Sequence, residues 1–138
     1  MNVEALFSIN QFGLDYERLR LEAALSNIAQ SNAVIGKGQT PMLAQVTATN
    51  GDFQALVAGG SPGAAPAAHL GQVAAKSRAV HDPANPMADA NGDVHYVDVD
   101  MATEMTNLMS ASRAYEANVR GINTLQEMTE KALQIGGR

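Results

Sequence analysis

Three side chains at alternate positions, late in the sequence, have the spacing of metal ligands. Asp89, Asn91 and Asp93 imitate the first three ligand positions of a calcium-binding loop, where carboxylate and amide oxygens surround the ion. That loop also needs a glycine and a glutamate at fixed later positions, which here hold Val94 and Asp100. Because the strictest positions fail, a solvated hairpin turn is the better interpretation, and we expect no metal.

The other residues that could do chemistry are histidines and serines. His69, His81 and His95 do not have the spacing of metal-ligating histidines, so we expect surface or loop positions for them. Ser110 and Ser112 lie within a helical pattern, without the G-x-S-x-G turn and histidine partner that activate a serine nucleophile. The sequence therefore predicts neither an enzyme nor a cofactor-binding protein.

Composition narrows the classes further. The 138 residues carry a formal net charge of −5 and include no cysteine. A chain without a basic patch is not expected to bind nucleic acid, and the lack of cysteine excludes disulfides and zinc–thiolate sites. No stretch approaches the ~20 consecutive apolar residues that span a bilayer. The N-terminus lacks the basic region of a secretory signal peptide, so we expect a cytoplasmic protein, or one exported without a cleaved signal.

The element that would organise such a chain is a helix over residues 100–135. Asp98 or Asp100 is placed to cap its start, and Gly136-Gly137 to end it. Seven of ten positions spaced by three and four residues are large and apolar, as in a coiled-coil seam. The ten are Met101, Met105, Leu108, Ser112, Tyr115, Val119, Ile122, Gln126, Thr129 and Leu133.

A first long helix is predicted over residues 3–32, and it has two apolar stripes. One contains Phe7, Leu14, Leu21, Leu25 and Ile28. The other contains Phe12 and Leu19, about 160° away around the helix at 100° per residue. Two stripes indicate contact with more than one neighbour, although a central core helix would look the same.

Between these helices the sequence predicts a small, irregular β insert. Short strands are expected over 43–49, 53–57, 72–80 and 94–99, with Asn91-Gly92 as a hairpin turn. A flexible segment over 58–68 is rich in Gly, Ala and Pro. The predicted fold is mainly α, with the terminal helices pairing as an antiparallel, coiled-coil-like hairpin. Residues 1–35, 36–98 and 99–138 would form one structural unit.

The C-terminal helix needs a partner surface. Burial of its seven apolar side chains releases roughly 10–20 kcal/mol at most. Ordering such a helix costs on the order of 50 kcal/mol in conformational entropy, before backbone hydrogen bonds are counted. The difference favours a helix that packs on other helices rather than one that stands alone.

Four blocks of sequence resemble one known family. Residues 85–94 read N-P-M-A-D-A-N-G-D-V, residues 97–105 read V-D-V-D-M-A-T-E-M, and residues 109–119 read M-S-A-S-R-A-Y-E-A-N-V. Together these resemble the C-terminal half of the FlgC family of bacterial flagellar basal-body rod proteins. Residues 18–32 are similar to the N-terminal signature of flagellar axial proteins, from which Gln30 and residues 41–44 depart.

This resemblance implies a structural subunit of the proximal rod, the drive shaft that crosses the periplasm and transmits torque for motility. Its partners would be other rod subunits and further copies of itself in a helical assembly. It would be exported unfolded by the flagellar type III apparatus, and its terminal helices would become ordered on assembly. The expected assembly interface comprises Phe7, Phe12, Leu14, Leu19, Leu21, Leu25, Ile28, Met101, Met105, Leu108, Tyr115, Val119, Ile122 and Leu133.

A different class of protein is also compatible with the pattern. A cytoplasmic helical-hairpin adaptor or export chaperone, which does not polymerise, would show the same two helices and the same acidic charge. A chain found in purified basal bodies would favour the rod, and a purely cytoplasmic pool would favour the adaptor.

Overall fold

The computed structural model describes residues 3–36, 38–49 and 66–136. The elements in chain order are α1 (Val3–Gln30), β1 (Met42–Thr49), β2 (Ala67–Ala74), β3 (Ser77–His81), β4 (Asp93–Val97) and α3 (Met101–Gly136). The predicted class, mainly helical with a small β insert, is confirmed at this level. The strand predicted over 53–57 lies outside the described residues, as does most of the segment predicted to be flexible; Ala67 and Ala68 belong to β2.

Local signals set the helix ends close to the predicted positions. α3 begins directly after Asp100, whose carboxylate accepts the Thr103 hydroxyl at 2.7 Å. The other carboxylate oxygen accepts the backbone N–H groups of Ala102 at 3.0 Å and Thr103 at 3.3 Å. These bonds satisfy donors that the first turn leaves without partners. Bonding to the Thr103 hydroxyl, and then to the backbone N–H groups, holds the pKa of Asp100 below its usual value.

The β insert consists of two antiparallel hairpins. β1 pairs with β2, and β3 pairs with β4. The single strand predicted over 72–80 is wrong, because the chain changes partner at residues 75–76. The Ala75 N–H still bonds to the Pro41 carbonyl beside β1, whereas the Lys76 carbonyl accepts the Asp98 N–H beside β4, both at 2.9 Å.

The turn signal at Asn91-Gly92 was placed correctly but belongs to a longer loop. Gly92 has a φ of +81°, which favours glycine. Its N–H bonds to the Asp89 carbonyl at 3.1 Å and closes a turn. The connection between β3 and β4 nevertheless spans residues 82–92, so the two strands are not joined by a two-residue turn.

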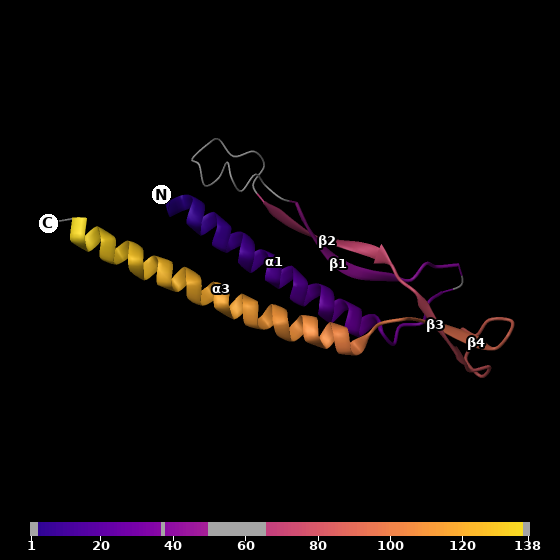
Figure 1. Ribbon diagram of the computed structural model, residues 1–138. Helices are drawn as coiled ribbons and strands as arrows, with labels where there is room; N and C mark the ends of the chain where they lie inside the picture. The colour runs from indigo at the N-terminus through magenta and orange to yellow at the C-terminus, as the bar shows by residue number, and fades with distance from the viewer. Residues whose placement is uncertain (1–2, 37, 50–65, 137–138) are drawn as a thin grey trace.

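α1 lies between α3 and the β1–β2 hairpin (Figure 1). The two helices run antiparallel, so the N and C ends of the chain lie at the same end of the molecule. The β3–β4 hairpin extends from the opposite end. It is tied to the segment after α1, because the Ile35 N–H donates to the His95 carbonyl at 2.8 Å. The helix pair is therefore flanked by one hairpin and extended by the other.

The buried core is small and consists of small side chains. The described hydrophobic residues that are buried are Ala23, Ala24, Val94, Val97 and Ala111. The two valines lie on β4, and the three alanines lie on the helices. Because these side chains are small, the described core buries little apolar area.

The antiparallel register of the helices is regular. Three separate contacts join pairs whose residue numbers each add to 131: Asn27 with Glu104, Gly13 with Asn118, and Asn10 with Gly121. At the second of these, a Cβ on Gly13 would lie 3.0 Å from the side-chain nitrogen of Asn118. The constant sum shows that one register holds along the length of the pair.

Candidate assembly interface

The stripe of α3 that faces α1 lies beside the predicted seam. Glu104, Ala111 and Asn118 follow one another at seven-residue intervals, which places them on one side of the helix. Glu104 and Asn118 contact α1, and Ala111 between them is fully buried. A small residue and two polar ones occupy this stripe, so it carries almost no hydrophobic signal in the sequence.

The predicted seam residues therefore divide into two groups. Leu108, Ile122 and Thr129 are half-buried. The other large apolar members of the seam stay exposed, so the pairing of α1 and α3 is not built on them. Their exposed fractions are 41% for Met101, 44% for Met105, 36% for Tyr115, 37% for Val119 and 72% for Leu133.

The two apolar stripes of α1 also have different surroundings. Phe12 and Leu19 line a cavity of about 520 Å³ between α1 and residues 66–70 at the start of β2. The same chain therefore covers part of the stripe that we expected to face other subunits. In the longer stripe Leu25 is 54% exposed; the half-buried members are Phe7, Leu14, Leu21 and Ile28.

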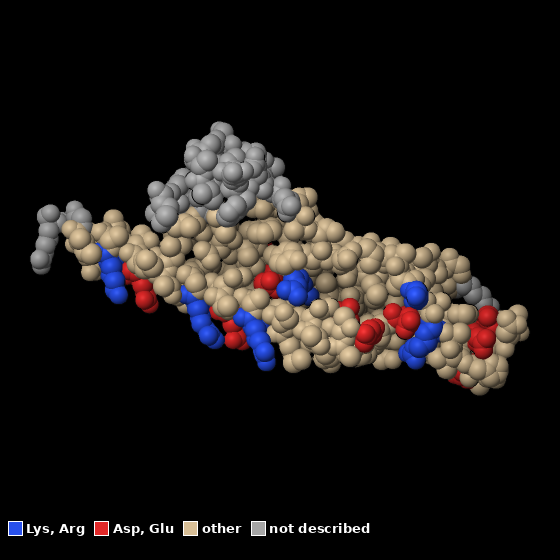
Figure 2. Space-filling model, in the orientation of Figure 1, with Lys and Arg blue, Asp and Glu red and all other residues tan. Residues whose placement is uncertain are grey.

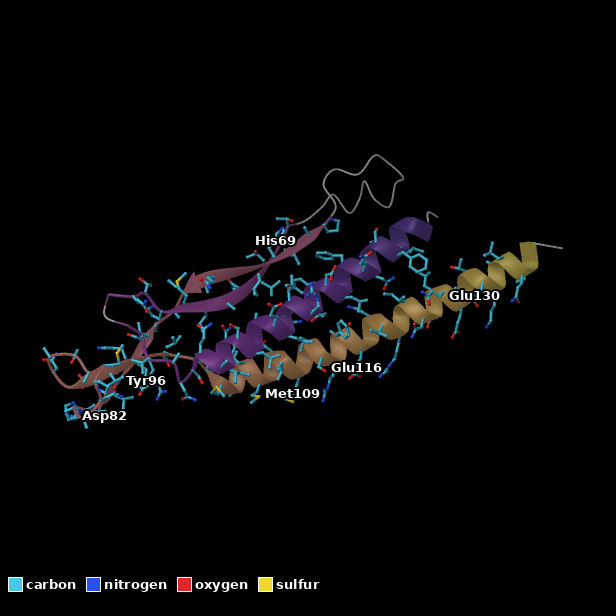
Figure 3. All side chains as sticks on the ribbon, turned by 180° about the vertical axis from the view of Figure 1, so that it is seen from behind. His69, Asp82, Tyr96, Met109, Glu116 and Glu130 are labelled. Carbon is cyan, nitrogen blue, oxygen red and sulfur yellow. The ribbon has the colours of Figure 1, made fainter. Side chains whose placement is uncertain are left out.

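Charged side chains gather on the outer side of α3, and Figure 2 shows them along its edge. The exposed charged residues of this helix are Arg113, Glu116, Arg120, Glu127, Glu130 and Lys131. Figure 3 locates Met109, Glu116 and Glu130 along α3, with His69 on β2 beyond α1. The ion pair of Arg120 with Glu116, 3.4 Å apart, is exposed and contributes little to stability. This side of α3 is therefore solvated.

The acidic residues that resembled calcium ligands are engaged within their own loop. One oxygen of Asp89 accepts the N–H groups of Asn91 at 2.8 Å and Asp93 at 3.0 Å. Bonding to the Asp93 N–H, and then to the Asn91 N–H, lowers the pKa of Asp89. The carboxylate of Asp89 is thus a turn-forming group. Across residues 3–36, 38–49 and 66–136, no cluster of three His, Cys, Asp or Glu is placed to hold a metal.

All three histidines lie in strands, and two of them meet acidic partners. His69 is in β2, His81 ends β3 and His95 is in β4; the first two are exposed and the third is half-buried. His81 Nδ1 lies 2.8 Å from Asp93 Oδ1, across the β3–β4 ladder. His95 Nε2 lies 3.5 Å from Asp89 Oδ2. Sequence reasoning missed both pairs because they depend on the register of β3 against β4.

The serines considered as nucleophiles, Ser110 and Ser112, are exposed on α3. Within the part of the chain that the structure describes, neither helix is both long and apolar enough to cross a membrane.

Sequence reasoning also missed one buried polar residue that connects several elements. Asn27 is only 4% exposed and joins three elements. Its side-chain nitrogen donates to the Ala44 carbonyl of β1 at 3.0 Å and to Glu104 Oε1 of α3 at 3.3 Å. Its side-chain oxygen accepts the Ala44 N–H at 2.7 Å. Asn27 lies within residues 18–32, which resemble the axial-protein signature, but its partners become known only once β1 and α3 are placed.

Comparison with known proteins gives consistent matches. A family model described as the C-terminal part of the flagellar basal body rod FlgEFG proteins matches residues 92–135. The flagellar basal-body rod protein FlgC of Salmonella typhimurium is 37% identical over 132 residues, 95% of this chain and 96% of that protein. FlgC of Yersinia enterocolitica is 35% identical over 137 residues, 99% of each chain. FlgC of Bacillus subtilis is 47% identical over 57 residues, 41% of this chain and 38% of that protein.

Two of these relatives cover nearly the whole chain at more than a third identity. The family consists of structural proteins of the flagellar basal body, and its members assemble with other rod components. The chain therefore belongs to the FlgC family of flagellar basal-body rod proteins, and it is a structural subunit of the rod.

Proposed function

We propose that this rod subunit assembles through an apolar face made of Leu21, Leu25 and Ile28 on α1 and Met101 and Met105 on α3. The observation that carries the proposal is the exposure of three of these five residues, beside the half-buried Leu21 and Ile28. Leu25 is 54% exposed, Met101 41% and Met105 44%. Contiguous large apolar side chains on a protein surface mark interaction sites. Methionine is also unbranched and adapts to different partners, which suits a subunit that meets several kinds of neighbour.

Helix geometry supports the grouping of these five residues. In the register where facing numbers add to 131, Leu25 lies level with residue 106 and Ile28 with residue 103. Both therefore lie beside Met101 and Met105. On α1 this stripe is about half a turn from Phe12 and Leu19, at 100° per residue. Since that second stripe lines the cavity beside β2, the apolar face points away from the β1–β2 hairpin.

The remaining exposed residues of the predicted interface extend the contact along the rod. Tyr115 and Val119 continue the exposed side of α3, and Leu133 is 72% exposed near its end. Different surfaces of one subunit then meet different surfaces of the next. Contacts of that kind, between copies of this chain and with other rod subunits, generate an open helical assembly rather than a closed ring. Coiled-coil-like packing of the helices within it transmits torque.

Assembly and folding are coupled in this proposal. The buried hydrophobic residues of the described chain are three alanines and two valines, which release little free energy on burial. A chain with such a core can pass through the flagellar type III export apparatus unfolded, and can complete its helix pair only against neighbouring subunits. Circular dichroism of the dilute chain should then show far less helix than α1 and α3 together contain.

Substitutions on the apolar face test the proposal. Leu25→Asp and Met105→Asp place a charge where a neighbour would bury it, so swimming and recovery of the chain in purified basal bodies should both be lost. The matched control is Ala117→Asp, on an exposed residue of α3 that lies about 120° from Met105 around the helix at 100° per residue. Normal swimming with either of the first two variants would contradict the proposal.

Fractionation of cells separates the rod subunit from the adaptor that the sequence also allowed. The proposal predicts that the chain is recovered in purified basal bodies. A chain found only in the cytoplasm would instead support a non-polymerising adaptor or export chaperone.

A further inference from the structure

Asn27 makes a contact that resembles the pairing of two strands. Its amide oxygen accepts the Ala44 N–H at 2.7 Å, while its amide nitrogen donates to the carbonyl of the same residue at 3.0 Å. A side-chain amide carries a donor and an acceptor side by side, as a neighbouring strand would. Both backbone groups of Ala44 are therefore satisfied by a helix side chain on the edge of β1 that does not pair with β2.

The second N–H of the same amide reaches the other helix. It donates to Glu104 Oε1 at 3.3 Å, in the first turn of α3. Asn27 is 4% exposed, and its two donors and its oxygen all have partners. Buried polar groups carry a large penalty when they lose a partner, so this arrangement is satisfied only when β1 and α3 are both in place.

The predicted seam of α3 also holds three polar residues, Ser112, Gln126 and Thr129. Ser112 and Gln126 are exposed. The hydroxyl of Thr129 donates to the Leu125 carbonyl of its own helix at 2.8 Å. Alanines in a helix contact distinguish one register from another only weakly. Polar groups at the contact, such as Asn27 and Asn118, can select a register because their partners stand at fixed positions.

We propose that Asn27 is a positioning residue that selects the register of α1 against α3 and, through the same amide, fixes the β1–β2 hairpin on the helix pair. Three hydrogen bonds from one side chain tie the three elements together. A shift of α3 by one turn would move Glu104 away and leave one N–H of a buried amide without a partner. The hairpin and the helix register are therefore set together, and the chain presents a single shape to its neighbours.

The proposal makes a distinctive chemical prediction about charge. Asn27→Asp keeps an acceptor for the Ala44 N–H but turns a carboxylate toward the Ala44 carbonyl and the Glu104 carboxylate. Asn27→Ala removes the bonds without adding repulsion. Asn27→Asp should therefore be the more harmful of the two. Adding Glu104→Gln to Asn27→Asp supplies an amide donor to the new carboxylate and should restore part of the function, whereas Glu104→Gln alone keeps an acceptor and should be close to neutral.

Register can be read directly because the chain has no cysteine. Gly13→Cys together with Asn118→Cys places two thiols at a facing pair of the register, and mild oxidation of cells or purified basal bodies should join them within one chain. Loss of partners at a buried polar group typically amounts to a 5- to 150-fold change, roughly, in such an equilibrium. The ratio of cross-linked to free chain should decrease by a factor in that range for Asn27→Ala, and by a larger factor for Asn27→Asp.

The control is Asn123→Asp, which adds the same charge at an exposed position of α3 and should leave cross-linking unchanged. Partial rescue of Asn27→Asp by Glu104→Gln, in both cross-linking and swimming, supports the proposal. An unchanged cross-link ratio in Asn27→Asp, or no rescue by Glu104→Gln, overturns it. Either result leaves membership of the rod untouched, because the presence of the unmodified chain in basal bodies is measured separately.

Discussion

Replacing Ala111 with leucine tests the close packing of the helix pair. Ala111 is fully buried in the stripe of α3 that faces α1, and the buried hydrophobic residues described on α1 are alanines at positions 23 and 24. Leucine adds three carbons, whose removal from water would by itself be favourable by ~2.4 kcal/mol. Because Ala111 has no solvent-exposed surface, we expect the helices to separate or the new side chain to adopt a strained rotamer. Overpacking of this kind destabilises by about 1–3 kcal/mol.

That free energy corresponds to a change of roughly 5- to 150-fold in the equilibrium between paired and separated helices. The assay is the cross-link between Gly13→Cys and Asn118→Cys, measured in cells with and without Ala111→Leu, together with swimming. Ala117→Leu is the matched control, because Ala117 is an exposed alanine of the same helix. If Ala111→Leu and Ala117→Leu gave equal cross-linking, α1 and α3 would not pack through their alanines, and the reasoning would be refuted.

Two further predictions concern the elements that support the helix pair. Val94 is fully buried, so Val94→Ala should destabilise the β3–β4 hairpin by about 2 kcal/mol through lost burial and the cavity left behind. Hydrogen exchange of the β3 and β4 amides should accelerate in this variant. The acceleration should be much smaller for Val80→Ala, because Val80, the cross-strand neighbour of Val94, is 39% exposed. Asp100→Ala should fray the first turn of α3, whereas Asp100→Asn keeps a capping oxygen. The folded-state pKa of Asp100 is lowered from its usual value of 3.8. The contribution of its carboxylate to helix stability is therefore present above the unfolded pKa and is lost as the pH falls through the lower, folded-state pKa. Nuclear magnetic resonance of the Ala102 and Thr103 amides would show no acid-dependent change if the cap were unimportant.

The helices were predictable because their signals are local. The Asp100 cap and the absence of proline between residues 101 and 136 are visible in the sequence, and α3 begins one residue after that cap. The mainly helical class follows from the same signals. The boundary between β2 and β3 was not predictable, because it depends on distant partners. The Ala75 N–H bonds to the Pro41 carbonyl, whereas the Lys76 carbonyl accepts the Asp98 N–H. The residue types in 72–80 do not indicate that the strand changes partner there.

The helix contact was misplaced for a physical reason. A seam prediction looks for large apolar residues, and Met101, Met105 and Val119 satisfied it. Helices that approach closely select small residues instead, and Ala111 gives a weak hydrophobic signal although it is fully buried. The large residues are left at the surface, where they are available to other subunits. Asn27 was missed because an amide becomes informative only once its three partners are known.

Thiol labelling of the apolar face tests the central claim most directly. A single cysteine at Leu25, in a chain that otherwise has none, can be compared in purified basal bodies and in the free chain. A second variant, Ala117→Cys, reports an exposed side of α3 away from the apolar face. The account predicts that the cysteine at Leu25 reacts several-fold more slowly in basal bodies than in the free chain, while the one at Ala117 stays reactive. Equal reactivity of the Leu25 position in the two samples would contradict an assembly through this face.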